Sequence, residues 1–297
     1  MKLTYIVKNT DDFFNLKELL KTYFFMSDRL ILKLKKENRF LVNNQVVTVN
    51  SKISTGDVVD INIDFNEDDS EFPAVKMNLD IIYEDEAFLV INKPAGIPVH
   101  PSLNHYEDSL ANGVKYYFNS KNIHKKIRPV NRLDKDTSGI VIFAKNEYIQ
   151  ECLVRQMKSN DFKKEYIAIC DGLFSQKSGK IDKPIARKEN SIIERCISID
   201  GSPSVTYYDV IEENIDLFYS VVKCKLETGR THQIRVHLQS VGHSILGDTL
   251  YGTSSNLINR QALHSNIVSF IHPITKQNIS FTAPLPNDML KLCGVHK

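Results

Sequence analysis

Short apolar runs and helix-spaced apolar positions are interspersed along this chain without a regular strand–helix–strand repeat. The runs over residues 58–63, 87–92 and 140–144 are bounded by polar or turn-forming residues, which is typical of buried strands. After Asn146, a favourable N-cap residue, apolar side chains recur with helical spacing up to about residue 162. The pattern predicts an α+β fold, with a mixed, mostly antiparallel central sheet and flanking helices.

The first 64 residues predict a small α+β unit of their own. Helices are expected over residues 16–25 and from Ser27 or Asp28 onward, and the Asn43–Asn44 pair predicts the turn of a hairpin. This layout resembles the alpha-L RNA-binding module. A generic small α+β unit is the alternative interpretation.

Four cationic side chains, on the second predicted helix and just after it, are the expected RNA contacts of this unit. They are Lys33, Lys35, Lys36 and Arg39. Contacts of this kind go mostly to phosphates and supply affinity that depends on salt. A solvated charged face is the alternative interpretation.

The stretch from Asp64 to Glu71 is acidic, has almost no apolar content and is soon followed by a proline. This composition predicts a linker over residues 65–74. The linker would separate an N-terminal unit, residues 1–64, from a larger domain over residues 75–290.

Composition narrows the functional classes. The net charge is only +2, but basic residues gather over residues 29–39 and 121–135, where they could contact a polyanion. The five cysteines have no paired spacing, so neither a disulfide framework nor a zinc site is expected. The first residues are too polar for a signal peptide, and no segment is apolar enough to span a membrane, so we expect a cytoplasmic location.

The densest polar motif, Asn-Arg-Leu-Asp-Lys-Asp-Thr-Ser-Gly over residues 131–139, leads directly into the apolar run over 140–144. A tight turn attached to a core strand can hold one side chain to catalytic tolerance. Asp134, close to Arg132 in this turn, is therefore a candidate nucleophile. Three alternatives stay open: a turn residue, a metal motif of a glycosyltransferase formed with Asp136, and a glycosidase carboxylate pair.

A second polar motif covers residues 226–238 and follows an expected strand. The helix is predicted to begin near Arg230 and to end at Gly242, with His232, Arg235 and Gln239 on a polar stripe that usually faces solvent. The free N–H groups at the start of such a helix would favour phosphate or carboxylate groups.

The sequence gives no reason to expect a metal or a nucleotide cofactor. His232 and His237 are five residues apart, which places them on different faces of a helix. Dinucleotide-binding, Walker and nucleophile-elbow motifs are absent from the sequence. The candidate chemical groups are Asp134, Arg132, Arg230, Arg235 and Tyr166, with a Lys and a His from the loop over residues 93–101.

Several motifs, in order, resemble those of the RluA-type pseudouridine synthases over about residues 75–287. Residues 131–139 are similar to the family's catalytic signature. The other matching segments are 85–101, 164–168 with Gly172, 229–237 with 247–252, 262–264 and 281–286. Asn131 departs from the pattern, because the family often has His there, and residues 190–208 match no recognisable motif.

The resemblance implies an isomerase that converts uridine in RNA to pseudouridine without a cofactor. It implies that Asp134 is the nucleophile, that Arg235 pairs with it and that Tyr166 packs against the flipped uracil. Arg132 would occupy the space left by the flipped nucleotide or hold a phosphate. Arg230 and His232 are the remaining expected substrate-binding residues.

The expected partner is ribosomal RNA of the large subunit, with transfer RNA as the alternative, and the expected state is a monomer. A non-catalytic RNA-binding or ribosome-assembly factor of the same fold is one alternative function. A metal-dependent glycosyltransferase is the other.

Overall fold

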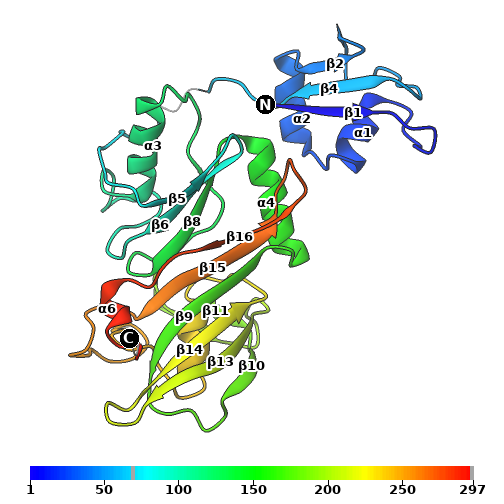
Figure 1. Ribbon diagram of the computed structural model, residues 1–297. Helices are drawn as coiled ribbons and strands as arrows, with labels where there is room; N and C mark the ends of the chain where they lie inside the picture. The colour runs from blue at the N-terminus through cyan, green and yellow to red at the C-terminus, as the bar shows by residue number, and fades with distance from the viewer. Residues whose placement is uncertain (68–70, 295–297) are drawn as a thin grey trace.

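The computed structural model describes residues 1–67 and 71–294, which form a small N-terminal part and a larger elongated part (Figure 1). The N-terminal part is a four-stranded antiparallel sheet with two helices, and its strand order is β1-β4-β2-β3. Its elements are β1 (Lys2–Ile6), α1 (Leu16–Thr22), α2 (Asp28–Lys36), β2 (Phe40–Val42), β3 (Gln45–Val46) and β4 (Val58–Asn62).

Local sequence signals account for most of this part. The Ser27 hydroxyl accepts a hydrogen bond from the Leu30 amide and caps α2, as predicted. Asn43 and Asn44 both have positive φ and form the expected hairpin turn. Helix α1 ends before the predicted limit of residue 25, because Phe25 adopts a left-handed conformation. Strand β1 was not predicted, although its alternating burial is typical of a half-buried strand.

The larger part is built on a ten-stranded sheet with the main order β10-β13-β14-β9-β15-β8-β6-β5, with β16 pairing with β15 and β7 with β8. All pairs are antiparallel except β8 with β15, so the predicted mixed, mostly antiparallel sheet is confirmed. Its strands are β5 (Ile81–Glu84), β6 (Phe88–Lys93), β7 (Arg128–Pro129), β8 (Ser138–Ala144), β9 (Lys163–Asp171), β10 (Ser178–Asp182), β13 (Val205–Asn214), β14 (Tyr219–Leu226), β15 (Leu263–Ile271) and β16 (Asn278–Thr282).

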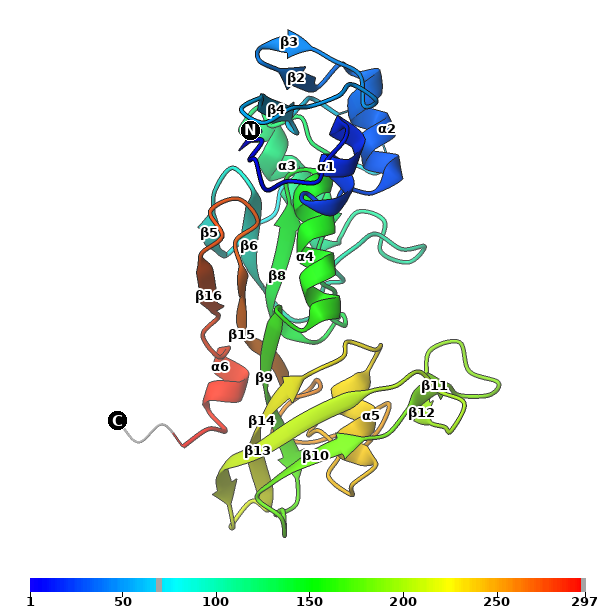
Figure 2. The ribbon, with the colours of Figure 1, turned by 90° about the vertical axis from the view of Figure 1, so that its right-hand side faces the viewer.

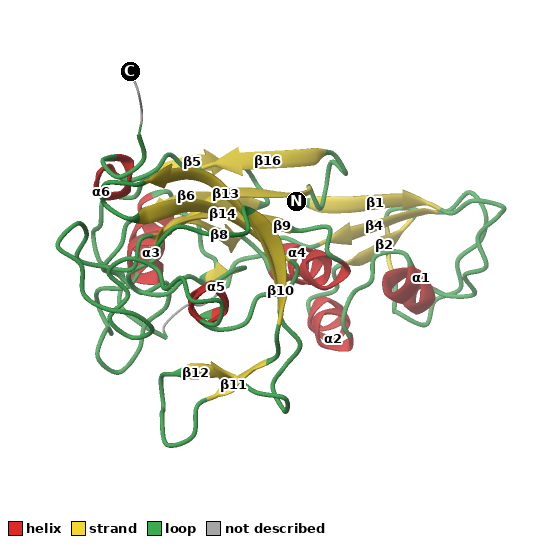
Figure 3. Ribbon diagram, turned by 90° about the horizontal axis from the view of Figure 1, so that it is seen from below, coloured by secondary structure: helices red, strands yellow, loops and turns green. Residues whose placement is uncertain are grey.

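Four helices accompany this sheet, and a separate two-stranded hairpin projects from the body beside α5 (Figures 2 and 3). Helix α4 begins after its predicted cap, Asn146, which accepts a hydrogen bond from the Ile149 amide. No helix of the described residues is long and apolar enough to cross a membrane. The helices are α3 (Leu110–Ser120), α4 (Glu147–Ser159), α5 (Gln233–Gln239) and α6 (Asn287–Leu290), and the hairpin is β11 (Ile185–Arg187) with β12 (Arg195–Ile197).

Strand β8 is the centre of the larger part, and every one of its residues is buried. Val141 and Phe143 pack with α3 on one face, while Ile140 and Ile142 belong to the apolar cluster that includes α4. Gly139 allows β8 to approach β15 closely. It has a φ of +111°, and a Cβ there would lie 2.2 Å from the Ser265 carbonyl oxygen. The strand that follows the candidate Asp134 turn is therefore fixed on both faces and along its edge.

The N-terminal part docks against the larger part through an apolar cluster and several charged contacts. Glu151 on α4 accepts hydrogen bonds from the amide and hydroxyl of Ser27. Glu67, in the predicted acidic linker, accepts two hydrogen bonds from Arg128 at 2.7 and 2.8 Å and one from Lys33 at 2.6 Å. The acidic segment therefore connects the two parts by ion pairs as well as by the chain. Residues 68–70 of this segment lie outside the described residues, and the domain limits stay a prediction.

We predict that Glu67→Gln lowers the free energy of unfolding by about 2 kcal/mol at pH 7, because Arg128 and Lys33 lose their charged acceptor. Burial alone raises the pKa of Glu67, but the hydrogen bonds from Arg128 and Lys33 bring it below the ordinary value of 4.5. The stabilisation is therefore present above that value and is lost as the pH falls through the lower pKa of the folded state.

Urea unfolding at pH 7, 5 and 3.5 measures this difference between the wild-type protein and the variant. Glu71→Gln is the matched control, because Glu71 is exposed and forms only a 3.4 Å surface pair with Lys126. An equal effect of both substitutions, or a difference that grows at low pH, would contradict the assignment.

Candidate active site

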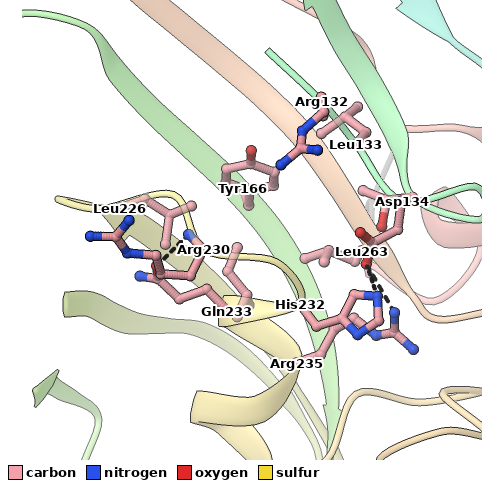
Figure 4. A pocket seen from close by; sticks show the side chains of 12 residues that line it. Arg132, Leu133, Asp134, Tyr166, Leu226, Arg230, His232, Gln233, Arg235 and Leu263 are labelled. Carbon is pink, nitrogen blue, oxygen red and sulfur yellow. Dashed lines mark hydrogen bonds and ion pairs between the residues drawn. The ribbon is translucent and has the colours of Figure 1, made fainter. Parts of the chain in front are cut away.

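An open pocket of about 370 Å³ lies where the loop before β8 meets β9 and the loop before α5. A volume of this order is usual for a ligand site, roughly 300–1,000 Å³. A smaller adjoining pocket shares much of its lining (Figure 4). The residues common to both pockets are Arg132, Leu133, Asp134, Tyr166, Leu226, Arg230 and His232. Arg235 lines the smaller pocket. The structure therefore brings together the residues that the sequence analysis expects for catalysis and substrate binding: Asp134, Arg132, Tyr166, Arg235, Arg230 and His232.

The backbone that carries Asp134 is held at each of its carbonyl groups. The Asp134 carbonyl accepts from the Thr137 amide at 3.1 Å, and the Lys135 carbonyl accepts from the Gly96 amide and the Lys93 ammonium. The Asp136 carbonyl accepts from the Arg260 guanidinium at 3.0 Å. Thr137 belongs to the turn itself, and the other donors come from two distant segments, so the turn has little freedom to move, as a nucleophile requires.

Lys93 is fully buried and acts as a clamp between two loops. Its ammonium donates to the carbonyls of Pro94, Ile97 and Lys135 at 2.8–2.9 Å, which uses all three of its N–H groups. Burial lowers the pKa of Lys93 to about 7, and the nearby charge of Asp136 acts in the opposite direction. Of the two residues expected from this loop, Lys93 therefore supports the site, whereas His100 packs against Phe72.

Arg235 joins two carboxylates from different parts of the chain. Its Nη1 lies 2.9 Å from Asp134 Oδ2, while its Nε and Nη2 donate to the two oxygens of Asp248 at 2.7 and 2.8 Å. Arg235 is 6% exposed and Asp248 is 1% exposed. Burial alone lowers the pKa of Arg235, but Asp248 and then Asp134 raise it above its usual range. A permanent positive charge therefore stands beside Asp134.

The helix that carries Arg235 differs from the prediction. It begins at Gln233 instead of near Arg230, because His232 adopts a left-handed conformation with a φ of +57°. The Gln233 carboxamide accepts from Arg230 N–H and Thr228 O–H, which holds the preceding loop away from helical geometry. A polar stripe on a helix usually faces solvent, but Arg235 is buried because Asp134 and Asp248 bind its guanidinium.

His232 faces Asp134 with one nitrogen and Tyr251 with the other. Its Nε2 lies 3.7 Å from Asp134 Oδ2, and its Nδ1 lies 2.8 Å from the Tyr251 hydroxyl, which itself accepts the Arg195 amide N–H. Burial lowers the pKa of His232, so the neutral ring is favoured at pH 7. The Tyr251 hydroxyl accepts the Arg195 amide and can donate its own hydrogen to Nδ1 of His232. This arrangement favours the tautomer that carries its hydrogen on Nε2, which faces Asp134.

Tyr166, Arg132 and Arg230 surround the space in front of Asp134 (Figure 4). Tyr166 is 6% exposed, and burial raises its pKa to about 12, with the Asp134 charge adding to the shift. Its phenol therefore keeps its proton at neutral pH. Arg132 and Arg230 are exposed cations at the pocket wall. An apolar ring and mobile positive charges can accommodate a flat, uncharged group attached to phosphates.

Asn131 has a structural role that its position in the motif did not reveal. Its carboxamide donates to the Ile140 carbonyl and accepts the Ile142 amide, both at 2.9 Å, as a paired peptide group would. The residue is buried and directs its carboxamide at β8. Asn131, at the position where the family often has His, therefore attaches the turn to strand β8.

The cations expected to contact RNA in the N-terminal part are not equally available. Lys33 is bound to Glu67 and Glu147, and Arg39 lies over the Phe65 ring near Glu37. Lys35 and Lys36 are exposed. The sequence alone did not show which of these four cations are engaged and which are exposed, because the acidic partners of Lys33 lie more than thirty positions away.

Sequence reasoning also missed Asp248 and Tyr251 as individual site residues. Both lie in the segment 247–252, which was noted only as part of a family motif. Helical or strand spacing does not identify these two residues, because their roles depend on contacts made in the folded chain: Asp248 binds Arg235, and Tyr251 binds His232. Across the residues for which the structure gives positions, no group of three or more His, Cys, Asp or Glu side chains could hold a metal ion.

The pocket holds the Asp134 carboxylate beside the buried Arg235, and two exposed arginines, Arg132 and Arg230, line its wall. The family model for RNA pseudouridylate synthase matches residues 87–240. The chain belongs to this family, which makes it an isomerase acting on RNA and confirms the expected fold and enzyme class.

Relatives and solved structures agree with this assignment. The chain is 41% identical to the uncharacterized RNA pseudouridine synthase YhcT of Bacillus subtilis, over 94% of this chain and 92% of that protein. It is 35% identical to ribosomal large subunit pseudouridine synthase D of Neisseria meningitidis, covering 88% and 72% of the two chains. Human RNA pseudouridylate synthase domain containing 1 has 27% identity and a TM-score of 0.59, covering 71% of this chain and 85% of that one.

We predict that Asp248→Asn lowers the rate of uridine isomerisation about 100-fold, because Arg235 loses a charged partner and no longer holds its position against Asp134. The same substitution should lower the free energy of unfolding by about 3 kcal/mol, because it leaves a buried charge less well paired. Single-turnover rates and urea unfolding measure the two effects.

Asp60→Asn is the matched control for this substitution. Asp60 is also a buried, ion-paired carboxylate, but it lies in the N-terminal sheet against Lys2 and Thr4. The control should lose stability and keep its rate. A rate within twofold of the wild-type value in Asp248→Asn would refute the role given to this carboxylate.

Proposed function

We propose that this enzyme isomerises a uridine in ribosomal RNA, with Asp134 as the group that acts on the sugar carbon bearing the base. The observation that carries the proposal is the 2.9 Å contact between Asp134 and the buried guanidinium of Arg235, at the wall of an open pocket. The guanidinium holds the Asp134 carboxylate in place at the pocket wall, and a carboxylate is able to act as a nucleophile. The similarity to the large-subunit pseudouridine synthase of Neisseria meningitidis supports a large-subunit ribosomal substrate.

The reaction proposed for the site needs no external atom donor. The bond from N1 of uracil to the ribose C1′ breaks, the base turns, and a bond forms from C5 to C1′. The proton lost from C5 is balanced by the one gained at N1. A carboxylate that holds C1′ while the base turns is sufficient in principle, so we infer that neither a cofactor nor a metal takes part.

The surrounding residues suit a flipped nucleotide. A uridine stacked in a helix cannot reach Asp134, so the base must leave its stack, and loops or bulges are the easier targets. Tyr166 would pack against the uracil. Because its pKa is about 12, we infer that it acts there as a protonated phenol and not as a base. Arg132 would fill the space vacated by the base or hold a phosphate, and Arg230 and His232 would complete the substrate contacts.

The retained polar network argues against the rival function of a non-catalytic assembly factor. Asp134, Arg235, Asp248, His232 and Tyr251 form one connected set of contacts. Binding RNA alone gives no reason to bury an arginine beside a carboxylate, since a buried charge pair is costly to desolvate. We therefore favour the enzyme, as a monomer, with transfer RNA as the second substrate class to test.

The test is pseudouridine formation in unmodified transcripts of large-subunit ribosomal RNA and of transfer RNA, scored by mass spectrometry. We predict product with the wild-type protein, at an undiminished rate in excess chelator, and a loss of at least 1,000-fold in Asp134→Asn. Asp136→Asn is the matched control, because the Asp136 side chain lines neither pocket and the contact with Arg260 is made by its backbone carbonyl. Retained activity in Asp134→Asn would overturn the assignment, and loss of activity in chelator would contradict the inference that no metal takes part.

We also propose that Lys35 and Lys36 supply RNA affinity from the N-terminal part, because they are exposed while Lys33 is engaged by Glu67 and Glu147. The double variant Lys35→Gln/Lys36→Gln should reduce the salt slope of RNA binding by about 1.5. Lys52→Gln, an exposed lysine of the same part, is the control. Fluorescence anisotropy from 50 to 300 mM salt measures the slope, and an unchanged slope in the double variant would exclude this contact.

A further inference from the structure

A second surface pocket, of about 290 Å³, lies at the base of the projecting β11–β12 hairpin. Three arginines from different segments line it: Arg187 of β11, Arg195 of β12 and Arg230 of the loop before α5. Asp200 is the one acidic residue in its lining. The hairpin stands away from the sheet beside α5 (Figures 2 and 3). The pocket adjoins the candidate active site, because Arg230 and Thr231 line both.

The two hairpin arginines are placed against each other without a compensating acid. Arg187 and Arg195 are directly opposite in the antiparallel register, an arrangement that is unfavourable for like charges. Arg195 Nη1 contacts only backbone carbonyls of its own turn, at Ile193 and Glu194. Within residues 1–67 and 71–294 neither arginine forms an ion pair. The neighbouring Lys188 and Glu194 do pair, so the hairpin is not uniformly basic.

The arginines of this pocket have N–H groups without an acceptor among the described residues, and such groups can bind an anion that has several oxygens. Each Arg has five N–H groups in a planar fork that matches phosphate geometry. Arg230 uses its Nε for the Pro203 carbonyl at 3.3 Å, and its terminal nitrogens have no hydrogen-bond acceptor in the part of the chain that the structure describes. A phosphate in this pocket would relieve the repulsion between Arg187 and Arg195 and would add charge-assisted hydrogen bonds.

The arginine pocket is continuous with the active site. Arg230 and Thr231 line both pockets, and the Arg195 amide donates to the Tyr251 hydroxyl that contacts His232. The hairpin and the catalytic pocket are therefore joined by two shared residues and by one short series of hydrogen bonds. A strand whose nucleotide enters the active site would carry its adjacent backbone past Arg230 toward the hairpin.

We propose that this arginine pocket binds a phosphodiester group of the RNA strand next to the nucleotide in the active site. The proposal rests on the proposed function for the polymer it names, and it assigns a role to a segment, residues 190–208, in which the sequence showed no motif. Arg187 and Arg195 are positioned to bind the backbone, and they do not touch the reacting base.

The test uses a fluorescently labelled single-stranded U12 oligonucleotide and measures its Kd between 50 and 300 mM salt. Arg187→Gln should weaken binding about tenfold at 100 mM salt and reduce the salt slope by about 0.7, the value for one phosphate contact on a single strand. Arg187→Gln/Arg195→Gln should reduce the slope by about 1.4. Lys291→Gln is the control, because this exposed cation follows α6 on the opposite side of the molecule from the hairpin (Figure 2).

Two results would overturn the proposal. One is an unchanged slope in the double variant, or an equal change in Lys291→Gln. The other is displacement of U12 by low millimolar inorganic phosphate at constant ionic strength, which would show that the pocket takes a free phosphate. Circular dichroism of each variant checks that the hairpin substitutions leave the fold intact.

The test of the phosphate pocket can be distinguished from the test of the proposed function. The same binding series is run in the Asp134→Asn protein, where the Arg187 effect should persist without any pseudouridine formation. Catalysis by the wild-type protein with no Arg187 effect would refute the phosphate pocket alone. An Arg187 effect in a wild-type protein that makes no pseudouridine would refute the proposed function and leave the pocket in place.

Discussion

The buried guanidinium of Arg235 is the constraint around which the site is organised. A charge so far from water must be paired, and its two partners come from the turn before β8 and from the segment after α5. Asp248 takes two of its N–H groups and leaves Nη1 for Asp134. The turn before β8, helix α5 and the segment after it are thereby fixed to one point, with Asp134 as the partner that faces the pocket.

The rest of the larger part keeps that point rigid. Gly139 lets β8 and β15 approach closely, Asn131 attaches the turn to β8, and Lys93 and Arg260 hold its carbonyls. The buried side chains of β8 secure the strand itself. The site thus combines a fixed carboxylate with exposed arginines at its rim, which suits a small reacting group on a long polyanion.

Local signals predicted what depends on neighbours in sequence. The caps at Ser27 and Asn146 marked α2 and α4, and the asparagine pair marked the first hairpin turn. The start of α5, the burial of Arg235 and the engagement of Lys33 could not be predicted in this way. Arg235 and Lys33 are held by partners tens of positions away, namely Asp134 for Arg235 and Glu67 and Glu147 for Lys33, so tertiary contacts outweigh local preference. The start of α5 depends on the left-handed conformation of His232 and on the side-chain contacts of Gln233, which helical spacing does not reveal. Asp134 was identified by its motif, whereas the geometry of its pairing required the folded chain.

The most direct measurement is a map of pseudouridine in ribosomal and transfer RNA from cells whose only copy of this gene encodes Asp134→Asn. The account predicts that at least one uridine of large-subunit ribosomal RNA loses its modification completely in these cells. Cells carrying Asp136→Asn should keep it. Full modification of every site in the Asp134→Asn cells would contradict the account, because the carboxylate paired with Arg235 would then be dispensable.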